Sequence, residues 1–83
     1  MKVLKRDGRL VDFDSNKIIH AIHKAMAETL LGVDESISRR IAAFVEEQIK
    51  KGGGIKSVEQ IQDMVEEQLM ASERKEAARK YIL

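Results

Sequence analysis

Three cationic side chains surround one short stretch near the start of the chain. Lys5 and Arg6 precede the dipeptide Asp7-Gly8, and Lys17 follows in a segment with the pattern of the first turns of a helix. The free N–H groups and the dipole of a helix N-terminus favour an anion, whereas a lysine there opposes the dipole. A bound polyphosphate would account for that lysine, and the alternative is that these are scattered surface cations.

A further lysine extends this cationic surface. Lys24 follows Lys17 by seven residues, or about two helical turns, so both lie on one face of the helix. A nucleotide bound there would also need an apolar slot for its base. The residues available for such a slot are equally those with which a small core would be built: Val3, Val11, Phe13, Ile18, Ile22 and Ile61.

Two other patterns resemble functional sites more weakly. His20 and His23 lie on one side of a helix, but zinc needs a third and usually a fourth ligand, so we expect a structural role for them. The segment GGGIKS at 52–57 departs from the phosphate-loop spacing because Ile55 stands where the second glycine is required. A helix stop followed by a capped helix start explains it. Because no nucleophile has a base and an orienting group, we expect no catalysis by this chain alone.

The composition is that of one small folded domain spanning residues 1–83. The chain is 43% hydrophobic and 35% charged with a net charge of +1, which argues against a general nucleic-acid binder. Without cysteine it has neither disulfides nor a thiolate zinc site, in keeping with a cytoplasmic location. It shows no apolar run of about 18 residues and no signal peptide, so we expect no membrane association.

The elements that would position these residues follow from hydrophobic periodicity. Residues 2–6 and 9–13 have the pattern of two short β-strands. The dipeptide Asp7-Gly8 between them predicts a hairpin with a type I′ turn, because that turn needs a positive φ at both central positions.

Two helices are expected after the hairpin. A cap at Asp14 or Ser15 starts the first, and Gly32 ends it. Its inward face, at helical spacing, comprises Ile18, Ile22, Ala25, Met26 and Leu30. The second opens at Asp34 or Ser36, and the glycine run that follows Lys51 ends it. Its inward face comprises Ile37, Ile41, Phe44, Val45 and Ile49.

A short extended segment at Ile55-Lys56 should lead into a third helix, started by a capping box of Ser57 and Gln60. A fourth helix is expected after a cap at Ser72. The inward residues of these two helices are Val58, Ile61, Met64, Val65, Leu69, Ala77, Ala78, Tyr81 and Ile82. The predicted fold class is therefore α+β, mainly α, with a short β-hairpin or small sheet as a lid over a four-helix bundle.

The chain resembles the ATP-cone domain in three segments. The first contains V-x-K-R-D-G at 3–8, F-D-x-x-K-I at 13–18 and A-I at 21–22. The others are V-E-x-I-Q-D-x-V-E-x-x-L at 58–69 and A-x-K-Y-I-L at 78–83. The resemblance implies a sheet lid over a four-helix bundle that binds ATP or dATP, with Mg²⁺, and regulates a neighbouring domain.

The resemblance also implies a biological context. Such cones lie mainly at the N-terminus of ribonucleotide reductases, and the motifs here are most similar to the anaerobic or adenosylcobalamin-dependent type. The expected function is allosteric control of reductase activity through oligomerisation, with the catalytic domain or subunit, and other copies of the cone, as partners. Two alternatives are a ligand-free helical interaction module and the cone of a nucleotide-responsive transcriptional repressor that lacks its zinc ribbon.

Individual positions take their expected roles from the resemblance. Lys5 and Lys17 match phosphate-contacting lysines, and Arg6 matches the arginine beside them. Val11 belongs to the base site, but many members carry an acidic residue there that accepts a proton from the adenine amino group, so base selectivity must come from other groups or be weaker. The remaining positions expected around base and ribose are Val3, Asp14, Ile18, Ile22, Ile61 and Gln62.

Overall fold

The computed structural model describes residues 1–54 and 56–81. Within them the strands are β1 (Lys2–Leu4), β2 (Leu10–Asp12) and β3 (Lys56–Ser57), and the helices are α1 (Ser15–Ala27), α2 (Glu35–Gly52), α3 (Val58–Ala71) and α4 (Lys75–Lys80). The predicted class, mainly α with a small sheet, is confirmed. Ile55 and Ile82, for which the sequence predicted an extended segment and an inward position, lie outside the described residues.

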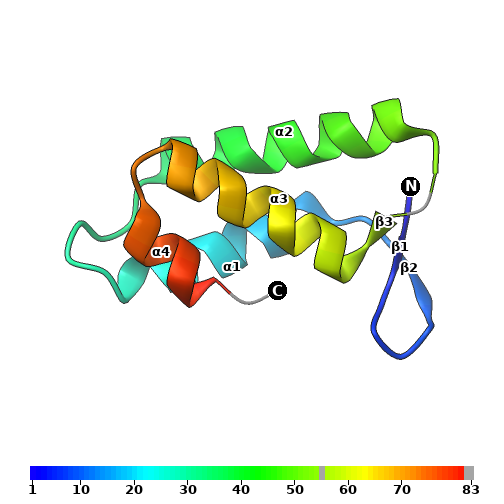
Figure 1. Ribbon diagram of the computed structural model, residues 1–83, viewed down its shortest axis with the longest axis horizontal. Coiled ribbons are helices and arrows are strands. Elements are labelled where there is room, and N and C mark those ends of the chain that lie inside the picture. Colours follow the sequence, from blue (N-terminus) through cyan, green and yellow to red (C-terminus); the bar gives the residue numbers. More distant parts are fainter. Residues whose placement is uncertain (55, 82–83) are drawn as a thin grey trace.

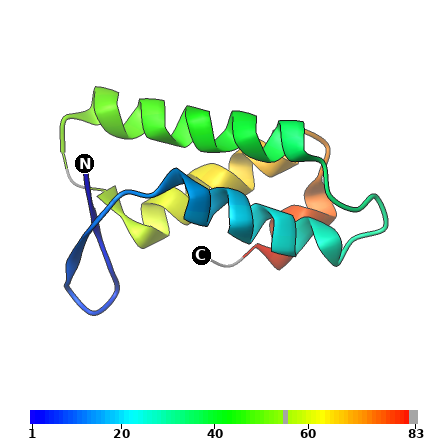
Figure 2. The same ribbon diagram turned by 180° about the vertical axis from the view of Figure 1, so that it is seen from behind.

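The helices form a ring in which α1 and α3 each pack against both α2 and α4. The long α2 runs along one side of the molecule, and the short α4 lies on the other (Figure 1). The hairpin projects from the end of the bundle at which α3 begins, and the loop between α1 and α2 lies at the opposite end (Figures 1 and 2). None of the helices in the described segments is long and apolar enough to cross a membrane.

The hairpin has shorter strands and a wider turn than predicted. β1 and β2 pair antiparallel with Val3 opposite Val11, and each has three residues. The type I′ prediction is wrong, because Gly8 has a φ of 88° while Asp7 keeps a negative φ. The Asp7 carboxylate accepts hydrogen bonds from the backbone N–H of Arg9 at 3.1 Å and from its Nε at 2.7 Å. This local turn holds Asp7 outside the left-handed region.

The third strand joins the hairpin to the start of α3. β3 pairs parallel to β1, with Lys56 opposite Val3, in the sheet order β2-β1-β3. Its last residue, Ser57, caps α3 by accepting a hydrogen bond from the N–H of Gln60 at 3.2 Å, and the Gln60 side chain accepts from the Ser57 N–H at 2.9 Å. The predicted capping box is therefore confirmed.

α1 begins as predicted and ends before Gly32. The N-cap is Asp14, whose carboxylate accepts a 3.0 Å hydrogen bond from a backbone N–H of the first turn. At the other end the Thr29 hydroxyl donates to the Met26 carbonyl at 2.6 Å, a local bond that competes with helix continuation. Leu30, predicted to face inward, lies beyond the helix and is 97% exposed, so that prediction is wrong.

The ends of α2 follow their local chemistry. The Asp34 carboxylate accepts hydrogen bonds from the N–H groups of Ser36 at 3.0 Å and Ile37 at 3.3 Å. At the C-terminal end Gly53 has a φ of 64°, a left-handed conformation that glycine adopts readily. The glycine run is thus a helix stop, as predicted.

Two further predictions about the helices are wrong. Phe44 is 37% exposed, because Ser38 and Ala42 take the inward face of α2 beside Ile41 and Val45. Ser72 does not cap α4, since it is the C-cap of α3, and α4 follows Arg74 without a side-chain cap.

One apolar cluster forms the core, and the described residues bury two polar side chains beside it. His23 Nε2 and Ser38 Oγ are hydrogen-bonded at 2.6 Å, which links α1 to α2. Arg74 donates to the carbonyl of Gly32, so the corner before α4 holds the loop before α2. The buried apolar residues are Val3, Ile18, Ile22, Ala25, Met26, Ile41, Ala42, Val45, Ile49, Val58, Ile61, Val65, Leu69, Ala77, Ala78 and Tyr81.

Candidate functional site

An apolar hollow, here called the slot, opens between the hairpin and the first turns of α1 and α3. Its volume is about 250 Å³. The sheet joins the hairpin to β3, which leads into α3, and α1 begins at the Asp14 cap shortly after β2. Residues of the hairpin, α1 and α3 therefore line the same hollow. The lining residues are Val3, Lys5, Val11, Asp12, Phe13, Asp14, Lys17, Ile18, Ala21, Val58 and Ile61.

The slot brings together most of the residues that the sequence singled out, and three lie elsewhere. Ile22 is fully buried in the core, on the inward face of α1. Arg6 and Gln62 lie outside the slot lining and contact one another. The predicted residues that line the slot are Val3, Lys5, Val11, Asp14, Lys17, Ile18 and Ile61.

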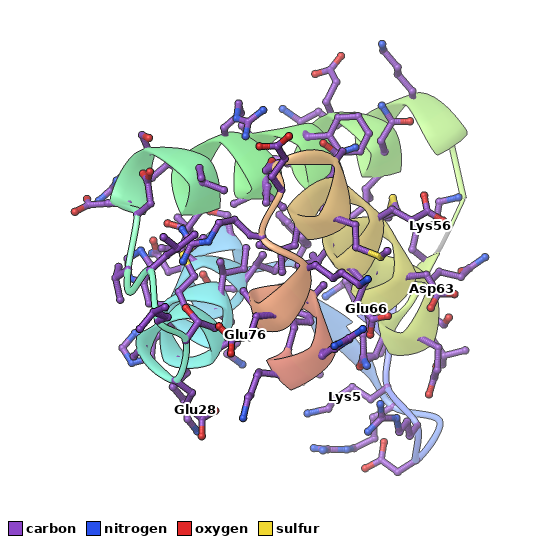
Figure 3. All side chains as sticks on the ribbon, turned by 60° about the vertical axis from the view of Figure 1, so that its left-hand side comes forward. Lys5, Glu28, Lys56, Asp63, Glu66 and Glu76 are labelled. Carbon is purple, nitrogen blue, oxygen red and sulfur yellow. The ribbon has the colours of Figure 1, made fainter. Side chains whose placement is uncertain are left out.

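Arg6 ties the hairpin turn to α3. Its Nε donates to Glu59 Oε1 at 2.9 Å, and its Nη2 lies 3.4 Å from Gln62 Oε1. The Gln62 amide donates in turn to Glu66 at 3.0 Å. Lys5 projects from the hairpin and Glu66 from α3 (Figure 3). The pKa of Glu59 lies below its usual value, first because its own backbone N–H donates to the carboxylate and second because Arg6 does.

The slot carries two lysines that form no ion pair with another described residue. In the described part of the chain, no carboxylate lies within 4.0 Å of the ammonium group of Lys5 or Lys17. Of the two carboxylates in the lining, Asp12 pairs with Lys2 at 2.7 Å and Asp14 caps α1. The hydrogen bond from Lys2 holds the pKa of Asp12 below its usual value. This arrangement favours an anion beside the apolar walls.

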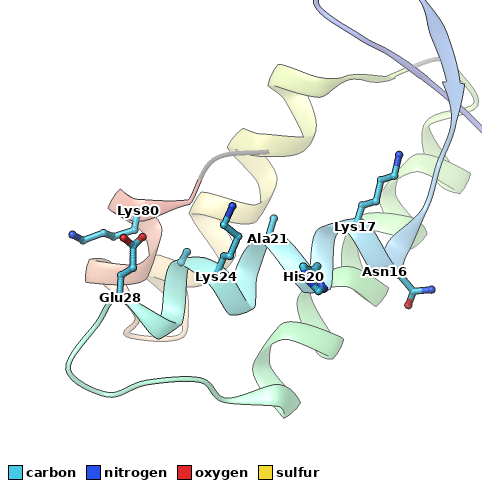
Figure 4. A pocket seen from close by; sticks show the side chains of 8 residues that line it. Asn16, Lys17, His20, Ala21, Lys24, Glu28 and Lys80 are labelled. Carbon is cyan, nitrogen blue, oxygen red and sulfur yellow. The ribbon is translucent and has the colours of Figure 1, made fainter.

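A second hollow, here called the trough, adjoins the slot along the outer face of α1 and has a volume of about 600 Å³. Lys17 and Ala21 line both hollows. Lys17 and Lys24 project from the same side of α1, and Lys80 of α4 lies near Glu28 (Figure 4). The lining residues are Asn16, Lys17, His20, Ala21, Lys24, Ala25, Glu28 and Lys80. The sequence predicted the strip of Lys17 and Lys24 but not Lys80, which only the packing of α4 against α1 brings there.

The other candidate patterns lie apart from the slot. His23 is bonded to Ser38 between two helices, and His20 is an exposed residue of the trough lining. Among residues 1–54 and 56–81, no group of three or more His, Cys, Asp or Glu side chains could hold a metal ion. The glycine run 52–54 lines neither hollow.

Comparison with known proteins identifies the family. The chain matches the family model described as "ATP cone domain" over residues 1–83. It is 39% identical over 74 residues to the vitamin B12-dependent ribonucleoside-diphosphate reductase of Thermoplasma acidophilum, and 40% identical over 81 residues to the anaerobic ribonucleoside-triphosphate reductase of Haemophilus influenzae. It is 32% identical over 92 residues to the ribonucleoside-diphosphate reductase subunit alpha of Chlamydia trachomatis.

These alignments cover most of this chain and a small part of each relative. They include 86%, 96% and 98% of this chain, and 9%, 11% and 9% of the respective relatives. The vitamin B12-dependent and anaerobic types that the motifs predicted are both among the relatives. The chain belongs to the ATP cone domain family.

Proposed function

We propose that this chain is a regulatory domain that binds ATP or dATP in the slot and thereby controls a ribonucleotide reductase. The observation that carries the proposal is the slot itself, in which apolar walls stand beside Lys5 and Lys17, two cations without a carboxylate partner among the described residues. A nucleotide needs both features at once, an apolar surface for its base and fixed cations for its phosphates.

The lining suggests how the ligand is oriented. Val3, Val11, Ile18 and Ile61 would enclose the adenine and its ribose, and Lys5 and Lys17 would contact phosphate, with Mg²⁺ as a counterion. Asp14 would lie near the ribose. Because valine cannot accept a hydrogen bond, Val11 leaves recognition of the adenine amino group to other groups.

The three predicted residues outside the slot lining would act less directly. Ile22 would support Ile18 from the core side. Arg6 and Gln62 would reach the ligand only by leaving their present contacts, and Arg6 would have to exchange Glu59 for a phosphate group.

Regulation would arise from differential binding. A nucleotide shifts an equilibrium between two states only as far as its affinities for them differ. ATP and dATP differ by the 2′-hydroxyl, and an unsatisfied buried partner for that group would cost about 1–3 kcal/mol. We propose that this difference changes how reductase subunits associate. Catalysis would belong to the reductase body and not to this domain.

An NMR titration of the ¹⁵N-labelled chain with Mg-ATP tests the proposal. The amide signals of Val3, Val11, Ile18 and Ile61 should shift in a saturable way, while signals from the far end of the bundle, such as Leu31, should remain in place. Shifts confined to other regions, or none at all, would contradict the assignment of the slot.

A second candidate function rests on a separate observation. The loop between α1 and α2 exposes Leu30, Leu31 and Val33 by 97%, 74% and 52% of their surfaces. It lies at the end of the bundle opposite the hairpin (Figure 1). Contiguous exposed apolar residues mark interaction surfaces, so a helical interaction module without a ligand is the alternative. Such a module would show no response to nucleotides.

A further inference from the structure

The slot is too small to enclose a whole nucleoside triphosphate. Its volume of about 250 Å³ is below the range of about 300–1,000 Å³ that small-molecule pockets usually occupy. Most of its lining is apolar, which suits a base and ribose better than a chain of charged phosphates. If a triphosphate binds as proposed above, part of its phosphate chain must lie outside the slot.

The trough is the adjoining space, and Lys17 stands at the junction. Lys17 and Ala21 line both hollows, so a ligand that leaves the slot past Lys17 enters the trough directly. Ala21 and Ala25 are the smallest of the α1 residues that line the trough, and their short side chains leave room above the helix. Lys24 lies about two helical turns beyond Lys17 on the same face.

The charges of the trough favour an anion over most of its length. Lys17, Lys24 and Lys80 have no carboxylate within 4.0 Å among the described residues. By contrast, Lys50 and Lys51 of α2 lie 3.6 and 3.8 Å from glutamates one turn earlier. The other groups in the lining are Asn16 and His20, which are formally neutral, and Glu28.

Glu28 limits the part of the trough that would bind an anion. It lies near Lys80, while Lys17 and Lys24 occupy the end closer to the hairpin (Figure 4). A phosphate chain that advances from Lys17 therefore meets Lys24 first, and at the far end the attraction of Lys80 opposes the repulsion of Glu28. This arrangement suits an anion of limited length, such as the terminal phosphates of a nucleotide.

We propose that the terminal phosphates of the nucleotide in the slot lie in the trough and contact Lys24 and Lys80. The proposal rests on the proposed function and adds two specificity-determining residues to it. Lys24 and Lys80 would not bind the nucleoside. They would make the domain prefer a nucleoside triphosphate to the corresponding monophosphate, because only the longer phosphate chain reaches them.

The test is isothermal titration calorimetry of the 83-residue chain with ATP and with AMP, each with Mg²⁺, at fixed ionic strength. In the double variant Lys24→Ala/Lys80→Ala, ATP affinity should fall at least about tenfold, and AMP affinity should stay within about twofold. Lys75→Ala is the matched control, because Lys75 is an exposed lysine of α4 that lines neither hollow. The Lys24→Arg variant should retain the preference for ATP.

Three outcomes would overturn the inference. Unchanged ATP affinity in the double variant, or an equal loss for ATP and AMP, would mean that the trough does not bind the terminal phosphates. Two bound ATP molecules per chain, of which the double variant loses one, would mean that the trough holds a separate ligand. These results leave the proposed function standing, whereas a chain that binds no ATP at all would remove both.

Discussion

Lys17 is one of two residues that line both hollows, and this position determines the expected effect of its replacement. Lys17 lines the slot and the trough, and Lys5 lines the slot from the hairpin side. Both residues are exposed, and neither belongs to the buried core cluster. Their proposed role in phosphate binding is therefore separable from folding.

We predict that Lys5→Ala and Lys17→Ala each weaken ATP binding by about tenfold, as expected for the loss of one charge-assisted contact. The melting temperature of the unliganded protein should change little, because exposed lysines without ion pairs add little stability. Calorimetric titration and thermal unfolding measure the two effects. Lys51→Ala, in the last turn of α2 and in the lining of neither hollow, is the control. Normal ATP binding by both slot variants would refute the assignment.

For single residues, the sequence predicted most of the slot lining, but it did not predict which neighbouring cations lie outside the slot. Lys5, Lys17 and Val11 could be assigned because motif and helical spacing place them locally. Arg6 could not be placed, because its pairing with Glu59 depends on how the hairpin meets α3, more than fifty residues later in the chain. Lys80 was missed for the same reason, since only tertiary packing brings α4 to α1.

The ends of the helices determine where the slot and the loops lie. Some of these ends are fixed by residues close in the sequence, and others by contacts with distant parts of the chain. Asp14, Asp34 and the Ser57–Gln60 box were predicted because each cap uses atoms within three residues of itself. Leu30 was misplaced because α1 stops where Thr29 bonds back to Met26. The start of α4 could not be predicted from Ser72. The buried Arg74, directly before α4, fixes this segment by its hydrogen bond to the distant Gly32.

The glycine run offers a matched test at the end of α2. Gly53→Ala should destabilise the protein by about 1 kcal/mol, because a φ of 64° strains any residue with a Cβ. Gly54→Ala should be close to neutral, since its Cβ would lie 4.0 Å from the carbonyl oxygen of Gly52 and no positive φ is required. Chemical denaturation measures both. Equal effects of the two changes would argue against a left-handed helix stop at Gly53.

The Asp34 cap makes a prediction about pH. The Ser36 hydroxyl, followed by the N–H of Ile37, donates to Asp34 and lowers its pKa from the ordinary value of 3.8. Because the folded state has the lower pKa, the ionised cap stabilises the protein fully above pH 3.8 and loses this effect as pH falls through the folded pKa. Asp34→Ala should therefore lower the melting temperature at neutral pH.

The control for the cap is Asp34→Asn, which keeps a capping oxygen and removes the titration. Its melting temperature should depend less on pH below 3.8 than that of the unchanged protein. If both proteins lose stability in parallel over that range, the carboxylate of Asp34 is not the group responsible.

The whole molecule is a small bundle, and the proposed ligand would contact the hairpin and several helices at once. The slot lies where the hairpin, α1 and α3 converge, and the trough extends from it to α4. A nucleotide that spans both would connect the lid to three of the four helices of the described chain. Ligand binding should therefore raise global stability and not merely order one loop.

The most direct test of this account is thermal unfolding of the chain with Mg²⁺ and ATP, dATP, GTP or no nucleotide. A ligand present at 100 times its dissociation constant should add about 2.7 kcal/mol of stability, which corresponds to several degrees in a domain of this size. We predict that ATP and dATP raise the melting temperature and that GTP raises it less. An unchanged melting temperature with saturating concentrations of all three nucleotides would contradict the nucleotide-binding function and favour the ligand-free interaction module.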